Sequence, residues 1–125
     1  MRKNTSQARH QSRFSWAVTP AKVRKAVRLL IKVGRPNKII LFGSYITGHM
    51  NAHSDLDMLV VKQGPVRNPR QESARLRRRL GDIVMPMDIL VVPEARLNAL
   101  KERRDLVYRE ALTTGRIFYE ADKKR

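Results

Sequence analysis

The sequence contains no cysteine, so disulfide bonds, thiol catalysis and cysteine-ligated zinc are all excluded. It also lacks an apolar run long enough to span a membrane, and residues 1–13 lack the apolar centre of a secretory signal. Neither G-x-x-x-x-G-K-[ST] nor G-x-G-x-x-G occurs, which disfavours a P-loop enzyme and a Rossmann dehydrogenase. We therefore expect a cytoplasmic protein without membrane association.

Acidic residues are scarce and unevenly placed. The chain has 11 Asp and Glu against 27 Lys and Arg, a formal net charge of +16. Residues 1–38 hold 11 basic groups and no acid, and residues 62–79 hold seven basic groups with Glu72 as the only acid. Such a field attracts polyanions in a salt-dependent way. The charge therefore predicts that the protein binds nucleic acid or an acidic partner. The alternatives are that the charge serves solubility or adaptation to heat.

A length of 125 residues fits one domain. We expect a disordered basic arm at 1–13, the folded domain at 14–120 and a basic tail at 121–125. Apolar periodicity and turn residues predict, in order, a helix from Thr19-Pro20 to Gly34, strands at Lys38–Phe42, Leu56–Lys62 and Met87–Val92, helices at 70–80 and from Pro93 to Thr114 with a break near Arg104–Asp105, and a short strand or extended tail at Arg116–Glu120. This order predicts an α/β fold with a small mixed sheet flanked by helices.

Three carboxylates occupy positions where a strand would otherwise be apolar. Asp55 and Asp57 are the first acidic residues of the chain, and side chains two positions apart on a strand share a face. Asp88 interrupts the third predicted strand and can join them if the two strands are neighbours. Three such carboxylates would repel one another, and divalent cations with oxygen ligands resolve that repulsion. A structural role for each carboxylate alone is the alternative.

A glycine and a serine follow the first predicted strand. Gly43 lets the backbone approach a ligand, and the amides after it can form a nest for phosphate. The Ser44 hydroxyl can donate a hydrogen bond to a phosphate oxygen. Ten residues separate Ser44 from Asp55, with Gly48 between them permitting a second tight turn. The pattern predicts a nucleotide and two Mg²⁺ ions held side by side.

The combination resembles the minimal nucleotidyltransferases of the DNA polymerase β-like superfamily. Their pattern of Gly-Ser, a second glycine, Ser-Asp-x-Asp and a later acid occurs here as Gly43-Ser44, Gly48, Ser54 to Asp57, and Asp88. The resemblance covers roughly residues 20–118. It implies a nucleotidyltransferase fold in which Gly43 and Ser44 bind the nucleotide phosphates. It further implies that Asp55, Asp57 and Asp88 are catalytic and bind the metal ions.

Chains of this size and motif closely resemble the antitoxins of HEPN–minimal nucleotidyltransferase pairs. That resemblance implies transfer of AMP from ATP to a tyrosine hydroxyl of a HEPN ribonuclease toxin. An RNA- or tRNA-modifying nucleotidyltransferase, whose basic helices would bind the tRNA, is the alternative. A non-catalytic domain that binds a partner or nucleic acid is the second alternative.

Two features stand apart from the family pattern. Many minimal members have an arginine just before the second glycine, and Thr47 occupies that position here. His49 and His53 are spaced for one helix face, but no Glu or Cys completes a zinc-binding pattern with them. We therefore expect a loop or structural role for both histidines.

Overall fold

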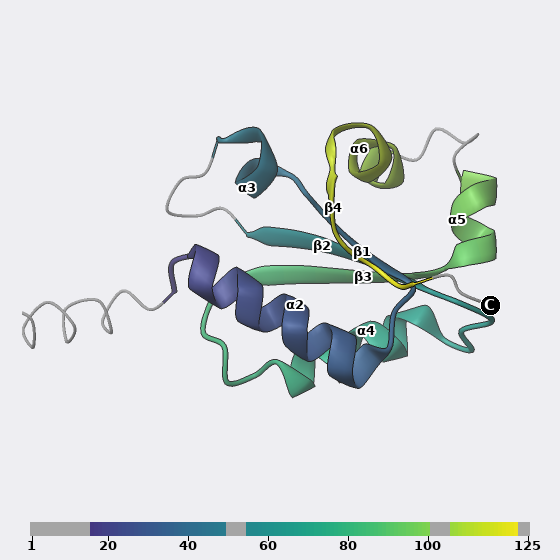
Figure 1. The fold of residues 1–125 in the computed structure, drawn as a ribbon, viewed down its shortest axis with the longest axis horizontal. Coiled ribbons are helices and arrows are strands. Elements are labelled where there is room, and N and C mark those ends of the chain that lie inside the picture. Colours follow the sequence, from purple (N-terminus) through teal and green to yellow (C-terminus); the bar gives the residue numbers. More distant parts are fainter. Residues whose placement is uncertain (1–15, 50–54, 101–105, 123–125) are drawn as a thin grey trace, which may run out of the picture.

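One mixed sheet of four strands organises the chain, and helices cover both of its faces (Figure 1). The computed structural model describes residues 16–49, 55–100 and 106–122. The elements are, in chain order, α2 (Pro20–Gly34), β1 (Lys38–Phe42), α3 (Ser44–Thr47), β2 (Leu56–Lys62), α4 (Pro69–Arg79), β3 (Met87–Pro93), α5 (Glu94–Leu100), α6 (Leu106–Thr114) and β4 (Arg116–Glu120).

The strands lie in the order β3-β2-β1-β4. β2 and β3 are parallel, whereas β1 is antiparallel to both β2 and β4. Parallel strands require a crossover connection, and α4 with its flanking loops supplies it. Because β2 lies between two strands and under helices on both faces, its residues from Met58 to Val61 are all buried.

Alternate residues of each strand contribute to two separate cores. On one face, Met58 and Ile89 pack with Leu30 under α2 and α4. On the other face, Leu59 packs with Leu97 of α5 and with neighbouring residues of α6. Figure 1 shows the same layers, with α2 and α4 below the sheet and α5 and α6 above it. The parity of a strand residue therefore tells which helix layer its side chain faces.

Helix α2 begins and ends as its sequence predicts. The Thr19 hydroxyl accepts a hydrogen bond from the Lys22 amide at 3.3 Å, and Pro20 occupies the first turn, where no amide is needed. Gly34 is the last helical residue, and Arg35 after it takes the left-handed conformation with φ 46°. A Cβ at Gly34 would lie 3.2 Å from Leu76 of α4, so this glycine lets the two helices approach closely.

Helix α4 has a thin apolar face and a network of charges. Leu76 is its only buried residue, and Leu80 just after it is also fully buried. The Glu72 carboxylate accepts hydrogen bonds from Lys62 Nζ at 3.0 Å and from Arg75 Nε and Nη2 at 2.9 and 2.7 Å. Arg75 Nη2 also donates to the Val33 carbonyl of α2 at 3.0 Å. The network ties α4 to β2 and to the end of α2.

The predicted α/β fold with a single small mixed sheet is confirmed. Arg116–Glu120, left open between strand and tail, forms β4 and pairs with β1 through a register shift between Ile39 and Ile40. The helix predicted to open at Pro93 begins at Glu94 instead. Pro93 ends β3, an edge strand, where the missing amide removes no ladder hydrogen bond from the sheet's interior.

Some predictions fall on residues outside the described ranges. They are the basic arm at 1–13, the helix break near Arg104–Asp105 and, for the most part, the basic tail at 121–125. Within the described residues, no helix combines the length and apolar character needed to cross a membrane.

The charge network on α4 gives a prediction for stability. Hydrogen bonding from Arg75, then from Lys62, lowers the pKa of Glu72 from 4.5 to about 2. A lowered carboxyl pKa stabilises the fold above the unfolded value and loses that contribution as the pH falls from about 4.5 toward 2. We expect Glu72→Gln to lower the free energy of unfolding by about 1–2 kcal/mol at pH 7.

Urea unfolding at pH 7 and pH 3 measures this effect. Asp82→Asn is the control, because Asp82 is exposed and has no ion pair with another described residue. Equal losses for the two variants at pH 7 would contradict the assignment.

Candidate active site

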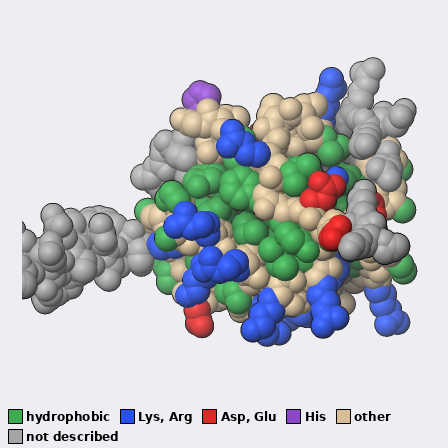
Figure 2. Space-filling model, viewed as in Figure 1, with side chains coloured by type: hydrophobic (Ala, Val, Ile, Leu, Met, Phe, Trp, Pro, Cys, Tyr) green, Lys and Arg blue, Asp and Glu red, His purple; other side chains and the backbone are tan. Residues whose placement is uncertain are grey.

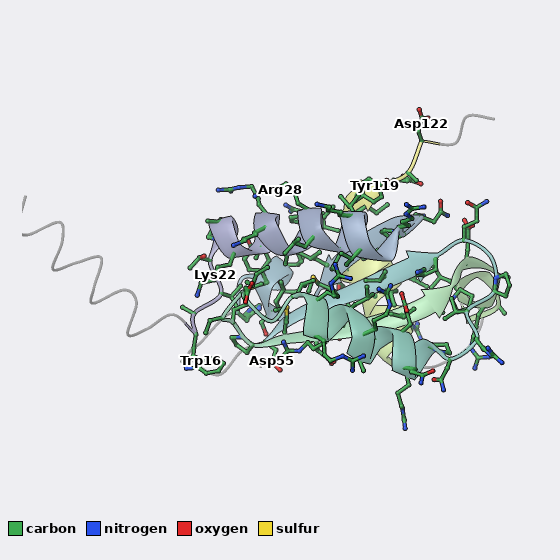
Figure 3. The ribbon with its side chains drawn as sticks, turned by 90° about the horizontal axis from the view of Figure 1, so that it is seen from below. Trp16, Lys22, Arg28, Asp55, Tyr119 and Asp122 are labelled. Atoms are coloured by element: carbon green, nitrogen blue, oxygen red, sulfur yellow. The ribbon has the colours of Figure 1, made fainter. Side chains whose placement is uncertain are left out.

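Two of the three predicted carboxylates face each other across the parallel ladder. Asp57 is the second residue of β2, and its register partner in β3 is Asp88. Both have the parity of the core residue Leu59, so their side chains point to the α5 and α6 face of the sheet. Asp55 has the same parity but lies just before β2 and is exposed. Figure 3 shows Asp55 at the end of the molecule where α2 begins.

The antiparallel ladder between β1 and β2 brings the glycine of the motif to the same place. Phe42 is the register partner of Asp57, and Gly43 follows it. Gly43 has φ +80°, and a Cβ there would lie 2.2 Å from Asp57 Oδ2. A side chain at position 43 would have to displace the Asp57 carboxylate. The sheet therefore sets the Gly43-Ser44 turn directly against Asp57.

The residues after Gly43 form one short helical turn. The amides of Ile46 and Thr47 both donate to the Gly43 carbonyl at 3.0 Å, and the Gly48 amide donates to the Ser44 carbonyl at 2.9 Å. The amides of Ile46 and Thr47 therefore already donate within α3. Only the amides at the very start of the turn are left for the predicted phosphate nest. Ser44 is half-buried as the first residue of α3.

Burial and neighbouring negative charges both raise the pKa of Asp57. The pKa of Asp57 is raised from 3.8 to about 6, first by burial and then by the negative charges of Asp88, Asp55 and Glu110. Glu110 was not predicted from the sequence. It lies on α6 next to Ala111, which is buried in the same core cluster as Phe42. No motif indicates it, because its approach depends on how α6 packs on the sheet.

The predicted cluster of three converging carboxylates is present as a pair with a third nearby. Across residues 16–49, 55–100 and 106–122, no three His, Cys, Asp or Glu side chains are grouped closely enough to hold one metal ion. Asp55 lies outside the ladder, so no backbone pairing turns it toward Asp57 and Asp88. The pair still fits a divalent cation, since carboxylate oxygens are its preferred ligands and its charge would offset the repulsion that raises the Asp57 pKa.

The two features outside the family pattern are Thr47, the last residue of α3, and the histidines that follow it in the sequence. Thr47 is exposed, and its hydroxyl lies 3.1 Å from Nδ1 of His49. The expectation of a loop or structural role for His49 stays a prediction. His53 lies outside the described residues.

The fold class is that of the nucleotidyltransferases, with a Gly-Ser turn and register-paired carboxylates at one end of a mixed sheet. A family model described as "Polymerase beta, Nucleotidyltransferase" matches residues 24–124, most of the chain. The chain therefore belongs to this nucleotidyltransferase family. No curated protein sequence matches it.

Solved structures share the fold at low sequence identity. A chain of a substituted MntA–HpeT toxin–antitoxin is 19% identical with a TM-score of 0.53, and the match covers 78% of this chain and 73% of that one. A chain of a toxin–antitoxin with AMP-PNP is 20% identical with a TM-score of 0.53, covering 83% and 75%. A protein from Sulfolobus solfataricus is 18% identical with a TM-score of 0.50, covering 86% and 94%. At these identities the likeness establishes the fold.

The contact between Gly43 and Asp57 can be tested by comparing two glycines of positive φ. Gly43 and Gly48 have φ values of +80° and +83°, but a Cβ at Gly48 would meet nothing within 4 Å. Gly43→Ala strains the backbone more, because Gly43 has ψ −156°, a conformation almost restricted to glycine, whereas Gly48 has ψ 14° in the left-handed region. Only Gly43→Ala also displaces Asp57. We expect Gly43→Ala to destabilise the protein by about 1–3 kcal/mol more than Gly48→Ala in urea unfolding. Part of that excess should disappear in an Asp57→Ala background, and an unchanged excess would contradict the close contact.

The raised pKa of Asp57 predicts that replacing this residue by a neutral one stabilises the protein, and that the gain depends on pH. Between pH 4 and about 6 the folded state binds more protons than the unfolded state, so the wild type loses stability as the pH rises. Asp57→Asn removes the charge and should raise the free energy of unfolding by about 1–2 kcal/mol at pH 7.5, allowing for solvent screening. The gain should vanish below pH 4. Urea unfolding in EDTA measures it, and a gain independent of pH would refute the electrostatic cause.

Proposed function

We propose that this chain transfers AMP from ATP to a hydroxyl group of a partner protein, and that this partner is a HEPN ribonuclease toxin. The observation that carries the proposal is the register pairing of Asp57 with Asp88 beside the Gly43-Ser44 turn. Family membership supports nucleotidyl transfer. The fold shared with chains of toxin–antitoxin complexes, one of them with AMP-PNP, supports the choice of partner and nucleotide.

In the proposed reaction, the hydroxyl oxygen of the acceptor attacks the α-phosphorus of ATP. A new oxygen–phosphorus bond forms, the bond between the α-phosphorus and its bridging oxygen to the β-phosphate breaks, and pyrophosphate leaves with that oxygen. The Asp88 carboxylate accepts the proton of the acceptor hydroxyl and passes it to solvent. The Ser44 hydroxyl donates to a phosphate oxygen and orients the chain of phosphates.

The carboxylates would also bind metal ions. Asp57 and Asp88, with Asp55 at the strand's start, would hold magnesium, which supplies charge neutralisation of the phosphates when bound. Gly43 contributes by its lack of a side chain, because any Cβ would push Asp57 away from the turn. Positioning and charge therefore account for most of the catalysis proposed for this site.

Transfer of label tests the proposal. The protein is incubated with magnesium and each α-³²P-labelled nucleoside triphosphate, together with the product of an adjacent HEPN gene or, separately, total tRNA. We expect label from ATP on the HEPN protein, and we expect Asp57→Asn to reduce transfer at least about 100-fold, as for loss of a group that stabilises charge in the transition state. Asp82→Asn is the control for removing an exposed carboxylate that is not part of the proposed site.

The remaining outcomes separate the alternatives. Label on tRNA and none on protein would favour the RNA-modifying enzyme over the proposed protein modification. Label on neither acceptor, with partner binding unchanged in Asp57→Asn, would overturn both catalytic functions in favour of a binding domain.

A further inference from the structure

Two hollows lie on either side of the segment that joins β2 to α4. The first has a volume of about 330 Å³ and is lined by Val66, Arg67, Asn68, Gln71, Glu72, Arg75 and Arg78. The second has a volume of about 480 Å³ and is lined by Val66, Asn68, Pro69, Arg70, Val91, Val92, Pro93 and Arg96. Val66 and Asn68 line both, so the hollows adjoin and form one concave region.

Arginines line both hollows: Arg67, Arg75 and Arg78 in the first, and Arg70 and Arg96 among mostly apolar residues in the second. Five arginines contribute, and the single carboxylate among the lining residues is Glu72. The Glu72 carboxylate already accepts hydrogen bonds from Lys62 and Arg75. Arg75 also donates to the Val33 carbonyl of α2, and this bond fixes its side chain against that helix. The arginines at positions 67, 70, 78 and 96 have no ion pair with another described residue. The concave region therefore presents uncompensated positive charge.

The basic character continues over the surface of α2 and α4. Their exposed basic residues include Arg24, Lys25, Arg28, Lys32, Arg77 and Arg79. None of these six forms an ion pair with another described residue. Figure 2 shows Lys and Arg side chains along the lower half of the molecule, over α2 and α4. Figure 3 looks onto this face and shows Arg28 pointing outward from α2. We give the name basic helix layer to this face together with the two hollows at its edge, the second of which also reaches Arg96 of α5.

The basic helix layer lies away from the carboxylate pair. Asp57 and Asp88 lie near the starts of β2 and β3 and point to the α5 and α6 face. The hollows adjoin the other ends of the strands, since Val91, Val92 and Pro93 line one of them. The five steps of extended strand from Asp57 to Lys62 span about 17 Å. A ligand in the hollows is therefore not the nucleotide proposed for the carboxylates.

The composition of the layer indicates which polyanion fits it. α2 and α4 contain no aromatic residue, and none lines the hollows, so stacking of unpaired bases is not available. The two helices lie side by side on the sheet (Figure 1), so neither projects far enough to enter a deep groove. Guanidinium groups bind phosphates, while the exposed Gln71 amide can both donate to and accept from a ribose 2′-hydroxyl.

We infer that the basic helix layer binds double-helical RNA through its phosphates and the wide, shallow minor groove, without reading sequence. A-form RNA presents its 2′-hydroxyls and phosphates across that groove, which a flat surface with shallow hollows can follow. The inference does not depend on AMP transfer, because it involves other residues and needs no nucleotide.

Binding of the full-length protein to a fluorescent 16-base-pair RNA duplex tests the inference by anisotropy. We expect affinity to fall at least tenfold between about 50 and 200 mM salt, as counterion release requires. Arg67→Gln combined with Arg78→Gln should weaken binding at least tenfold and reduce the salt dependence. Arg109→Gln combined with Arg116→Gln is the matched control, since both residues are exposed and the same charge is removed from the opposite helix layer and β4.

Three results would overturn the inference. The first is an equal loss of affinity in the two double variants, which would attribute binding to net charge alone. The second is equal affinity for a DNA duplex of the same sequence, and the third is no salt-sensitive binding of RNA by the wild type. Thermal unfolding of each variant checks that the fold is retained, and Arg78→Lys should keep most of the affinity because it keeps the charge.

Discussion

The parallel ladder between β2 and β3 is the constraint on which the rest of the molecule depends. Its register places Met58 and Leu59 in the two cores and, in the same step, places Asp57 opposite Asp88. A slip of one residue would turn the apolar side chains of β2 to the wrong faces, so the burial of both cores fixes the register. Hydrophobic burial thus holds together two like charges that would otherwise move apart.

Local patterns were sufficient for the elements and for part of the site. Thr19-Pro20 marked the start of α2 because its capping chemistry acts within one turn. The two-residue spacing of Asp55 and Asp57 predicted a common face. Gly43 was predicted to let the backbone approach a ligand, and in the fold its missing side chain makes room for Asp57. Each of these inferences needs only residues near one another in the chain.

The remaining features depend on contacts between distant segments. Glu110 reaches the neighbourhood of Asp57 only because Ala111 packs α6 onto the sheet, and no spacing in the sequence encodes that distance. The pairing of β4 with β1 was open for the same reason, since its partner lies some 80 positions earlier. The arginine-lined hollows likewise arise where the β2–α4 segment passes the end of β3. Asp55, outside the ladder, shows the limit of spacing arguments, because a shared face does not guarantee convergence.

The separation of charge between the two helix layers explains an apparent conflict. A net charge of +16 should favour ionised carboxylates and lower their pKa values, yet the pKa of Asp57 is raised. At physiological salt, charges beyond about 8 Å are largely screened. Burial is the first cause of the raised pKa, and the charges that add to it are those of Asp88, Asp55 and Glu110, whereas the basic side chains of α2 and α4 lie across the sheet. The sheet therefore lets one small domain keep a site suited to cations on one side and a surface suited to polyanions on the other.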